Sequence, residues 1–422
     1  MWLLARRQLL KSFRLGKRKG LFYSSRSDQP SSNGAGFSPR KVLILTKLSR
    51  LEFEKIRHSK LNDAELEKTL RERGSDYSSL LYHHYIHKGC ESRVEKCFQE
   101  FGTETRLVNR LNYNDECIEW ADLIVTTGGD GTFLMAASRI PDQSIPVIGF
   151  NSDPTRSEGH LCLPKNYSVN IREAIKNIIE GKFKWTFRRR IRVTLIGENV
   201  YDKPVELHDQ QLQHPEFRFF DCLQEQLKSV QNNGSSAQPR KRVLPVLALN
   251  EVYLGENVSA RVSYFEVAVN RDERIKTKNA GMCVSTGTGS TSWSYNISKI
   301  SPQIVSQIIE ILADEGVQGI SAKTKSFIEK ITKLYNERLT LNPEMKDMLY
   351  NIRDPITSYT LPLAYDLSPR GLARRLEVRS RCFDASLVID GGLSFSFNDG
   401  TVAILEVHDS DALRTVVDIR ND

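Results

Sequence analysis

The stretch DLIVTTGGDGTFLMA, from Asp122 to Ala136, decides the fold. Leu123 to Thr127 is a short, mostly apolar run of strand-forming residues, and a helical pattern begins at Thr132 or Phe133. Three glycines and a single carboxylate, Asp130, stand between the two. The sequence therefore predicts a buried strand, a tight turn and the start of a helix.

This turn is suited to holding an anion. Glycine has no Cβ, so several glycines together can present bare backbone N–H groups to phosphate, and the following helix adds its own N–H groups and partial positive charge. Asp130 could then accept a proton from an attacking hydroxyl, or hold the metal of a nucleotide. The alternative is an ordinary glycine turn with an exposed aspartate, since neither GxxxxGK[ST] nor GxGxxG is present.

The positive charge of the chain is concentrated at its beginning. The 422 residues carry a net charge of +8, yet residues 1–27 contain eight basic residues and no acidic one, which leaves 52 basic and 52 acidic residues in the rest. A balanced body argues against nucleic acid as a partner. The Arg-rich, acid-free, amphipathic leader is typical of a mitochondrial transit peptide, with a membrane-surface helix or a basic tail as alternatives.

We therefore expect residues 1–40 to be a transit peptide and a disordered Ser/Gly/Pro linker, and the protein to work in the mitochondrial matrix without stable membrane association. The seven cysteines are scattered without a CxxC pair, which predicts free thiols and no metal site. His83, His84 and His87 lie in HHYIH, where a solvated helix surface is the expected setting.

Strands and helices alternate between residues 41 and 182. The continuous apolar strands predict a Rossmann-like α/β domain with a parallel sheet covered on both faces. Ligands of such sheets lie beyond the carboxyl ends of the strands, where the glycine turn falls. Besides the opening stretch, the expected elements are strands at Lys41–Lys47, Thr105–Val108 and Ile145–Phe150 and helices at Leu51–Arg73, Leu80–Phe101 and Ile171–Glu180.

Residues 183–422 are rich in β-branched and aromatic strand patterns, which predict a β-sandwich-like second domain. Its C-terminal end could return to the first domain. Two insertions interrupt it, a surface insertion at 202–242 and a helical one at 301–350.

Two segments of this second domain carry further candidate site residues. Asn250 and Glu251 form a polar pair inside the apolar run LNEVY, where they could hold ribose hydroxyls or an amide; a strand end facing solvent is the alternative. STGTGSTSWSYN, from Ser285 to Asn296, combines two glycines with seven serine and threonine residues, which favours a loop lining a phosphate or sugar. Trp293 could stack on a base or pack internally.

Together these segments resemble the NAD kinase family, and within it the mitochondrial NAD kinases of animals. The matching motifs are GGDGT at 128–132, the Asn250–Glu251 pair and TGST at 288–291, and Asp390 with Gly391 looks like the DG turn of the family. GGDG alone is shared with diacylglycerol and sphingosine kinases and with phosphofructokinases. The other two motifs make the narrower assignment.

The resemblance implies that Mg²⁺ and ATP are used to phosphorylate the adenosine ribose 2′-hydroxyl of NAD, giving NADP, with Asp130 as the catalytic base and a homodimer as the assembly. The residues implied at the ATP phosphates are Gly128, Gly129, Gly131, Thr132, Thr288, Gly289 and Ser290, and those implied at NAD are Asn151, Asn250, Glu251, Thr291, Ser292 and Trp293.

Three departures from the family pattern leave the preference for NAD or NADH and the phosphate donor open. The Ala-Tyr that usually follows TGST is Ser292 and Trp293, the segment after Asn151 carries an insertion, and Ala280 replaces the usual Asp. A lipid kinase sharing the glycine turn and a non-catalytic nucleotide-binding protein are the alternative functions.

Overall fold

The structure is a computed structural model that describes residues 37–210, 240–317, 325–356 and 367–417. The predicted transit peptide and the middle of the first insertion lie outside these residues. No helix in the described ranges is long and apolar enough to cross a membrane. The cysteines within them are all free thiols.

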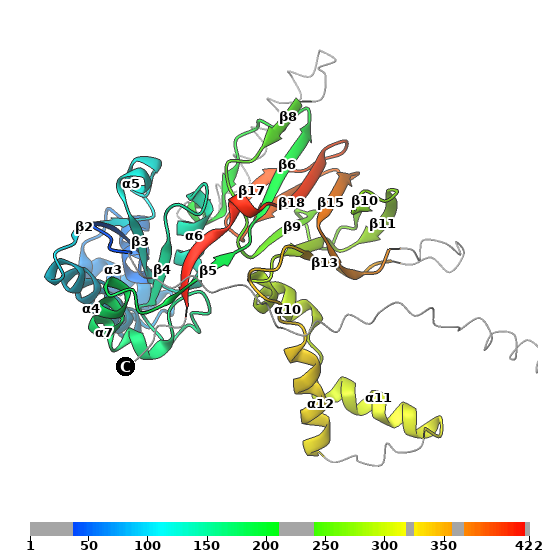
Figure 1. The fold of residues 1–422 in the computed structure, drawn as a ribbon, viewed down its shortest axis with the longest axis horizontal. Helices are drawn as coiled ribbons and strands as arrows, with labels where there is room; N and C mark the ends of the chain where they lie inside the picture. The colour runs from blue at the N-terminus through cyan, green and yellow to red at the C-terminus, as the bar shows by residue number, and fades with distance from the viewer. Residues whose placement is uncertain (1–36, 211–239, 318–324, 357–366, 418–422) are drawn as a thin grey trace, which may run out of the picture. The chain divides into compact units, whose positions relative to one another are not determined.

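The first sheet has the strand order β2-β1-β3-β4-β19-β5 (Figure 1). All neighbouring pairs are parallel except β5 with β19, which is antiparallel. The parallel sheet is as predicted, but β5 belongs to it although the sequence assigned residues from 183 onward to the second domain. The strands are β1 Lys41–Thr46, β2 Glu104–Asn109, β3 Leu123–Gly128, β4 Val147–Asn151, β5 Lys184–Arg188 and β19 Leu413–Val417.

Alternate residues of the central strands pack into two separate cores, because successive side chains of a strand point to opposite faces. Val42 and Ile44 pack with α4 (Tyr77–Glu100) and α7 (Ile171–Ile179). Leu43 and Leu45 pack on the other side with α5 (Asp115–Trp120) and α6 (Asp130–Arg139). The helices thus cover both faces of the sheet, as Figure 1 shows.

The single helix expected over Leu51–Arg73 is in fact two, α2 (Arg50–Arg57) and α3 (Asp63–Glu72). Asn62 begins the second, because its side chain accepts the backbone N–H groups of Ala64 and Glu65 while Glu65 bonds back to Asn62. Such a capping box starts a helix and ends any continuous one before it.

Two antiparallel sheets form the second region around one shared core, which confirms the predicted β-sandwich-like arrangement. Their orders are β11-β10-β15-β18-β6-β8 and β14-β13-β12-β9-β16-β17-β7. The strands are β6 Ile191–Gly197, β7 Val205–Glu206, β8 Arg240–Val243, β9 Glu251–Glu256, β10 Ser263–Val269, β11 Ile275–Asn279, β12 Met282–Ser285, β13 Met348–Ile352, β14 Arg370–Ala373, β15 Arg375–Ser380, β16 Ala385–Ile389, β17 Leu393–Ser396 and β18 Val402–Val407.

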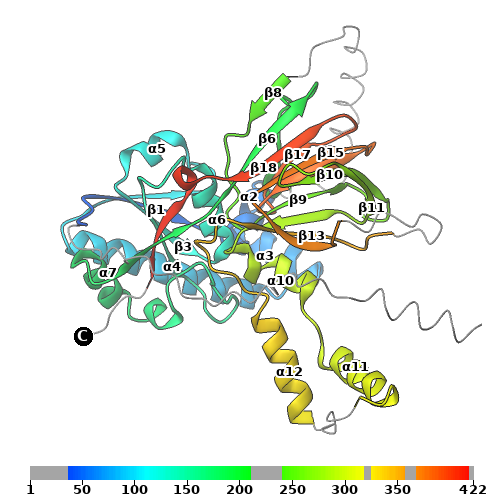
Figure 2. The same cartoon turned by 45° about the vertical axis from the view of Figure 1, so that its right-hand side comes forward.

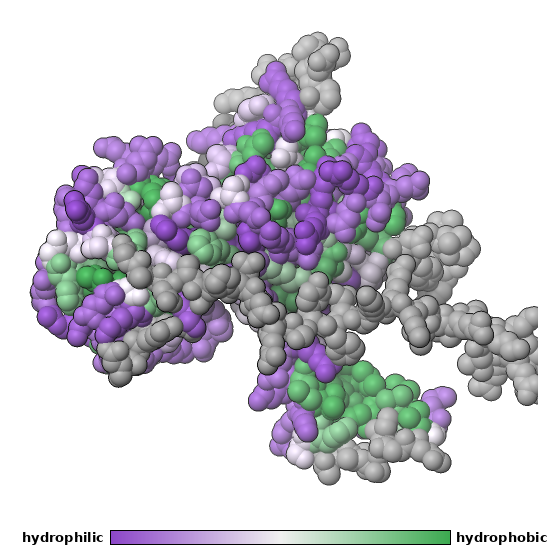
Figure 3. Space-filling view, viewed as in Figure 1, coloured by the Kyte–Doolittle hydropathy of each residue, from purple (hydrophilic) through white to green (hydrophobic). Residues whose placement is uncertain are grey.

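The second insertion contains two helices in its described part, α11 (Pro302–Asp314) and α12 (Lys325–Glu337), which lie side by side (Figures 1 and 2). Apolar side chains remain exposed on this helix pair, including Ile308 and Ile311 of α11 and Leu334 of α12. Figure 3 shows an apolar surface over this helix pair.

Replacing Gly89 by Ala is expected to stabilise the protein by about 0.5–1 kcal/mol, because glycine weakens a helix interior. Gly89 lies in the middle of α4, and a Cβ there would have no neighbour within 4 Å. Thermal unfolding should show a higher melting temperature. Gly102→Ala is the control, since Gly102 has a φ of +78° and should lose stability instead. A lower melting temperature for Gly89→Ala would contradict the argument.

Candidate active site

The glycine turn follows β3 directly, and α6 begins at Asp130 with Gly129 as its N-cap. The Asp130 carboxylate is held from outside the turn, since one oxygen accepts the backbone N–H of His160 at 3.1 Å and the other that of Leu161 at 2.8 Å. Each oxygen keeps a lone pair for a further partner. The carboxylate is therefore fixed in direction and still able to bind a hydroxyl or a cation.

Thr132 packs onto the turn rather than away from it. It is buried, and its hydroxyl lies where a Cβ of residue 128 would have to stand. Only glycine fits at 128, because any larger residue would collide with this side chain. Residues 128 and 132 of the GGDGT motif thus pack against each other, and anion binding by the motif stays a prediction.

The pair Asn250 and Glu251 is joined to the hydroxyl-rich loop after β12. Thr286 donates its backbone N–H to the Asn250 carbonyl at 2.9 Å and its hydroxyl to the Leu249 carbonyl at 2.5 Å. Leu249 in turn packs in the same core as Phe133 of α6. Two of the three predicted segments are therefore hydrogen-bonded to each other, and the third shares a hydrophobic core with Leu249.

Gly289→Ala should disrupt this junction, because the added Cβ would overlap the backbone carbonyl of Asn250. We expect a loss of about 1–3 kcal/mol of stability from the forced backbone shift and a weaker affinity for NAD. Calorimetric unfolding and NAD titration measure the two effects. Gly131→Ala is the matched control in the other loop, because a Cβ there would meet nothing within 4 Å. Equal NAD affinity in both variants would refute the prediction.

Asn250 and Glu251 do not face solvent, so the strand-end alternative is wrong. Their residues are 7% and 9% exposed, and Asn250 Oδ1 and Glu251 Oε2 have no hydrogen-bond partner among the described residues. Burial, and then the charge of Asp390, raise the pKa of Glu251 to about 8. Buried polar atoms without partners are costly, which indicates a polar ligand at this position.

Asp390 fixes the backbone of this pair, a role that the sequence did not predict although it singled out the DG turn. Its carboxylate accepts the N–H groups of Leu249, Asn250 and Glu251 at 2.8, 2.8 and 3.0 Å. Burial raises the Asp390 pKa to about 6 although these hydrogen bonds favour the charged form.

The residues of the hydroxyl-rich loop that were predicted to bind ATP or NAD differ in burial and in hydrogen bonding. Ser290 points into the protein, where its hydroxyl donates to the Gly287 carbonyl at 2.6 Å and accepts the Leu341 N–H at 2.8 Å. Thr291 is exposed, and Ser292 precedes α10 (Trp293–Ser298). Trp293 is 37% exposed and packs with its ring centroid 4.9 Å from that of Tyr253. The guanidinium of Arg353 also lies over the Trp293 ring, 5.6 Å from its centroid, so Trp293 packs against the protein while part of the residue stays exposed.

Asn151 shapes the loop after β4. Its amide donates to the Ser157 carbonyl at 3.0 Å, and its oxygen accepts the Asp153 N–H at 3.2 Å and the Ser157 hydroxyl at 3.0 Å. These bonds hold the segment that departs from the family pattern. The assignment of Asn151 to NAD binding stays a prediction.

The expected solvated surface is wrong for His87, which is buried, whereas His83 and His84 are half-buried. His83 Nδ1 lies 2.7 Å from an Asp153 oxygen, and His84 Nδ1 lies 2.8 Å from the Ser49 hydroxyl. His87 is fully buried, and burial lowers its pKa to about 4, so it is neutral. The cover over this face of α4 comes from β1 and α2.

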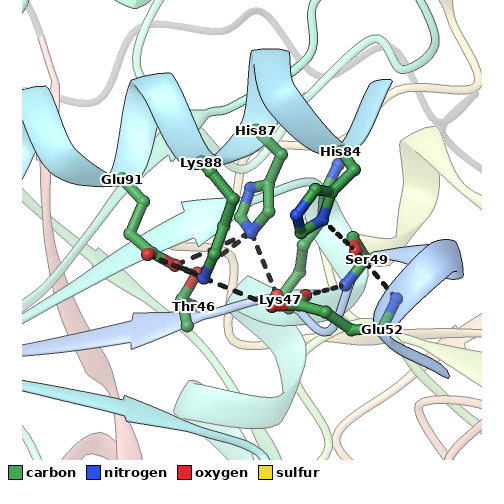
Figure 4. A network of polar contacts seen from close by, with 8 residues as sticks. All are labelled: Thr46, Lys47, Ser49, Glu52, His84, His87, Lys88 and Glu91. Atoms are coloured by element: carbon green, nitrogen blue, oxygen red, sulfur yellow. Dashed lines mark hydrogen bonds and ion pairs between the residues drawn. The ribbon is translucent and has the colours of Figure 1, made fainter. Parts of the chain in front are cut away.

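Figure 4 shows the resulting polar network between β1, α2 and α4. His87 Nε2 lies 3.0 Å from the Lys47 carbonyl, to which it can donate, and the Lys47 N–H donates to the Thr127 carbonyl at 3.0 Å. Lys88 bridges Glu91 and Glu52. The network thereby anchors the chain that runs beside the glycine turn.

Mg²⁺ fits this site as an ion carried by a nucleotide rather than as a resident ion. Within the described ranges no group of three or more His, Cys, Asp or Glu side chains could hold a metal. Mg²⁺ usually needs only one or two carboxylates when substrate phosphates supply the rest. Asp130 is the carboxylate at the glycine turn that could serve.

A fixed carboxylate at an anion-binding turn is suited to phosphoryl transfer, and with this fold it places the protein among the nucleotide-dependent phosphotransferases. Residues 54–183 match the family described as ATP-NAD kinase N-terminal domain. The chain is 40% identical over 387 residues to NAD kinase 2, mitochondrial, of Rattus norvegicus, and the aligned region covers 90% of this chain and 88% of that protein. It is 39% identical over 384 residues to the Homo sapiens protein of the same name, covering 90% and 85%. The protein therefore belongs to the NAD kinase family.

Among solved structures, the chain matches the crystal structure of an NAD kinase from Archaeoglobus fulgidus in complex with ATP, with a TM-score of 0.47 and 15% identity over 89% of this chain and 93% of that one. Family membership sets aside the lipid kinase alternative, which shared only the glycine turn.

Proposed function

We propose that this protein transfers the γ-phosphoryl group of ATP to the 2′-hydroxyl of the adenosine ribose of NAD, forming NADP and ADP. The observation that carries the proposal is the Asp130 carboxylate, held by two backbone N–H groups inside the GGDGT turn of a chain of the NAD kinase family. The unpartnered atoms of Asn250 and Glu251 support a polar nucleotide as the ligand next to it.

In the reaction the 2′-oxygen forms a bond to the γ-phosphorus as the bond to the β-phosphate oxygen breaks, and ADP leaves. The hydroxyl proton passes to Asp130, which the His160 and Leu161 N–H groups keep oriented towards the acceptor. The glycine turn and the first N–H groups of α6 receive the phosphate charge. Mg²⁺ bound with ATP supplies further neutralisation of that charge.

The acceptor is held by the segment that Asp390 fixes. With a pKa of about 8, Glu251 is protonated at neutral pH in the unliganded protein, so it can both donate to and accept from ribose hydroxyls. Asn250 adds an amide donor and acceptor. Trp293, which is partly exposed, could contact one of the bases with the part of its ring that Tyr253 and Arg353 do not cover.

We also propose that the enzyme works in the mitochondrial matrix as a homodimer. The word mitochondrial in the names of the relatives and the acid-free basic leader support the location. Import of a fluorescent fusion, with and without residues 1–40, tests the location, and light scattering tests the dimer. Cytosolic fluorescence of the intact fusion or a monomeric mass would contradict the respective statement.

The decisive experiment incubates the full chain with Mg-ATP and NAD and detects the product with an NADP-specific dehydrogenase. Parallel reactions replace NAD with NADH, diacylglycerol or sphingosine. NADP formation that requires both ATP and NAD is expected. Lipid phosphorylation, or nucleotide binding without turnover, would refute the proposal.

A further inference from the structure

Arg188, Arg189 and Arg190 follow one another in the chain but have different surroundings. Arg190 is fully buried and donates to the carbonyls of Ala137 and Ile140 at the end of α6, at 2.9 and 2.7 Å. Arg189 pairs with Asp409 at 2.7 Å and donates to the Glu344 carbonyl. The partners of both are protein groups, so both arginines are explained by the fold.

Arg188 has unused donors. It ends β5, and its Nη1 donates to the hydroxyl of Thr288 at 3.3 Å, across 100 residues of sequence. Its Nε is buried and has no hydrogen-bond partner in the described part of the chain. A buried N–H group without an acceptor is costly unless a ligand completes its bonding.

Asp130 lies near enough to Arg188 to act on its guanidinium electrostatically without touching it. Burial lowers the pKa of Arg188, and the charge of Asp130 opposes this effect. The two side chains nevertheless form no ion pair, because the Asp130 oxygens bond to His160 and Leu161 and Arg188 bonds to Thr288. A cation and an anion thus lie near each other with their remaining bonding capacity unused.

We propose that Arg188 is a catalytic residue that binds the phosphoryl group during its transfer, between the Thr288 loop and the glycine turn. The planar guanidinium matches phosphate oxygens better than an ammonium does. The inference rests on the proposed function and adds a residue that the motifs do not contain. Arg188 stays protonated throughout; it donates hydrogen bonds to the non-bridging oxygens while the proton of the 2′-hydroxyl goes to Asp130.

The test compares full-length Arg188→Ala, Arg188→Lys and Arg189→Ala with the parent in the NADP assay. Because Arg188 acts on the transferring group, Arg188→Ala should lower kcat by about 10²–10³-fold and change the KM for NAD by less than about threefold. Arg188→Lys should recover part of kcat, and added methylguanidinium should raise kcat of Arg188→Ala. Arg189→Ala should keep the parental kcat.

Two results would overturn the inference while leaving the proposed function intact. One is an Arg188→Ala protein with parental kcat. The other is a loss of kcat that methylguanidinium does not restore and that a lower melting temperature accompanies, which would mean that Arg188 only supports the fold. Failure of the proposed function is distinguishable, because then the parent itself would form no NADP.

Discussion

The Asp130→Asn protein is expected to form NADP with a kcat about 10³-fold below that of the parent, equal to about 4 kcal/mol of transition-state stabilisation. An amide cannot take the proton of the 2′-hydroxyl. The amide also offers one acceptor oxygen where the carboxylate offers two, so the His160 or the Leu161 N–H group loses its partner. Steady-state kinetics at saturating ATP and NAD measure the loss.

Asp142→Asn is the matched control for this substitution. Asp142 lies just beyond the far end of α6 and also accepts a backbone N–H group, that of Ser144 at 2.7 Å. Its asparagine variant keeps an oxygen that can accept this N–H group, and because Asp142 lies at the opposite end of α6 from the glycine turn, the variant should retain parental kcat. A parental kcat in Asp130→Asn would remove Asp130 as the base, and NAD titration of that variant separates lost chemistry from lost binding.

The glycine turn was predictable because its chemistry is local: strand, glycines, carboxylate and helix start follow one another in the sequence. The parallel sheet was predictable for the same reason, from apolar strands buried on both faces. The break between α2 and α3 also has a local signal, the capping box that begins at Asn62. It was not predicted because the helical pattern of apolar residues continues across the break.

Other features depend on contacts between distant residues, which no local pattern contains. Asp390 binds the Asn250 backbone across 140 residues. The polar sequence HHYIH indicated solvent, yet β1 and α2 cover His87. Arg188 is the first of three consecutive arginines, and only the fold separates it, with its unused buried donor, from the other two.

These distant contacts share a consequence for stability. Glu251 and Asp390 are buried close together, and burial raises the pKa of both carboxyl groups. Three backbone N–H groups donate to the Asp390 carboxylate and offset the cost of burying it. Glu251, by contrast, keeps an oxygen without a hydrogen-bond partner among the described residues. The folded protein therefore carries a destabilising group at the position where we place the acceptor, as expected where binding is favoured over stability.

Glu251→Gln should accordingly stabilise the unliganded protein, and increasingly so as the pH rises from 4.5 to 8. The pKa of Glu251 rises from 4.5 to about 8 on folding, so the folded state holds the proton more tightly than the unfolded state. The stability that this proton contributes is complete below pH 4.5 and is lost as the pH rises through 8. Glutamine does not titrate, so the variant avoids this loss. Above pH 8 its free energy of unfolding should exceed that of the parent by at most about 5 kcal/mol.

Urea unfolding of parent and variant at several pH values measures the effect, and Glu377→Gln provides a control of opposite sign. Although burial raises the Glu377 pKa, Arg274 and Arg375 hold it below its ordinary value. Glu377→Gln should therefore destabilise the protein at pH 7, and the difference should vanish in acid. If Glu251→Gln has the same stability as the parent at every pH, Glu251 is ionised and solvated in the folded protein. The argument that its unpartnered oxygen is a ligand-binding group would then be wrong.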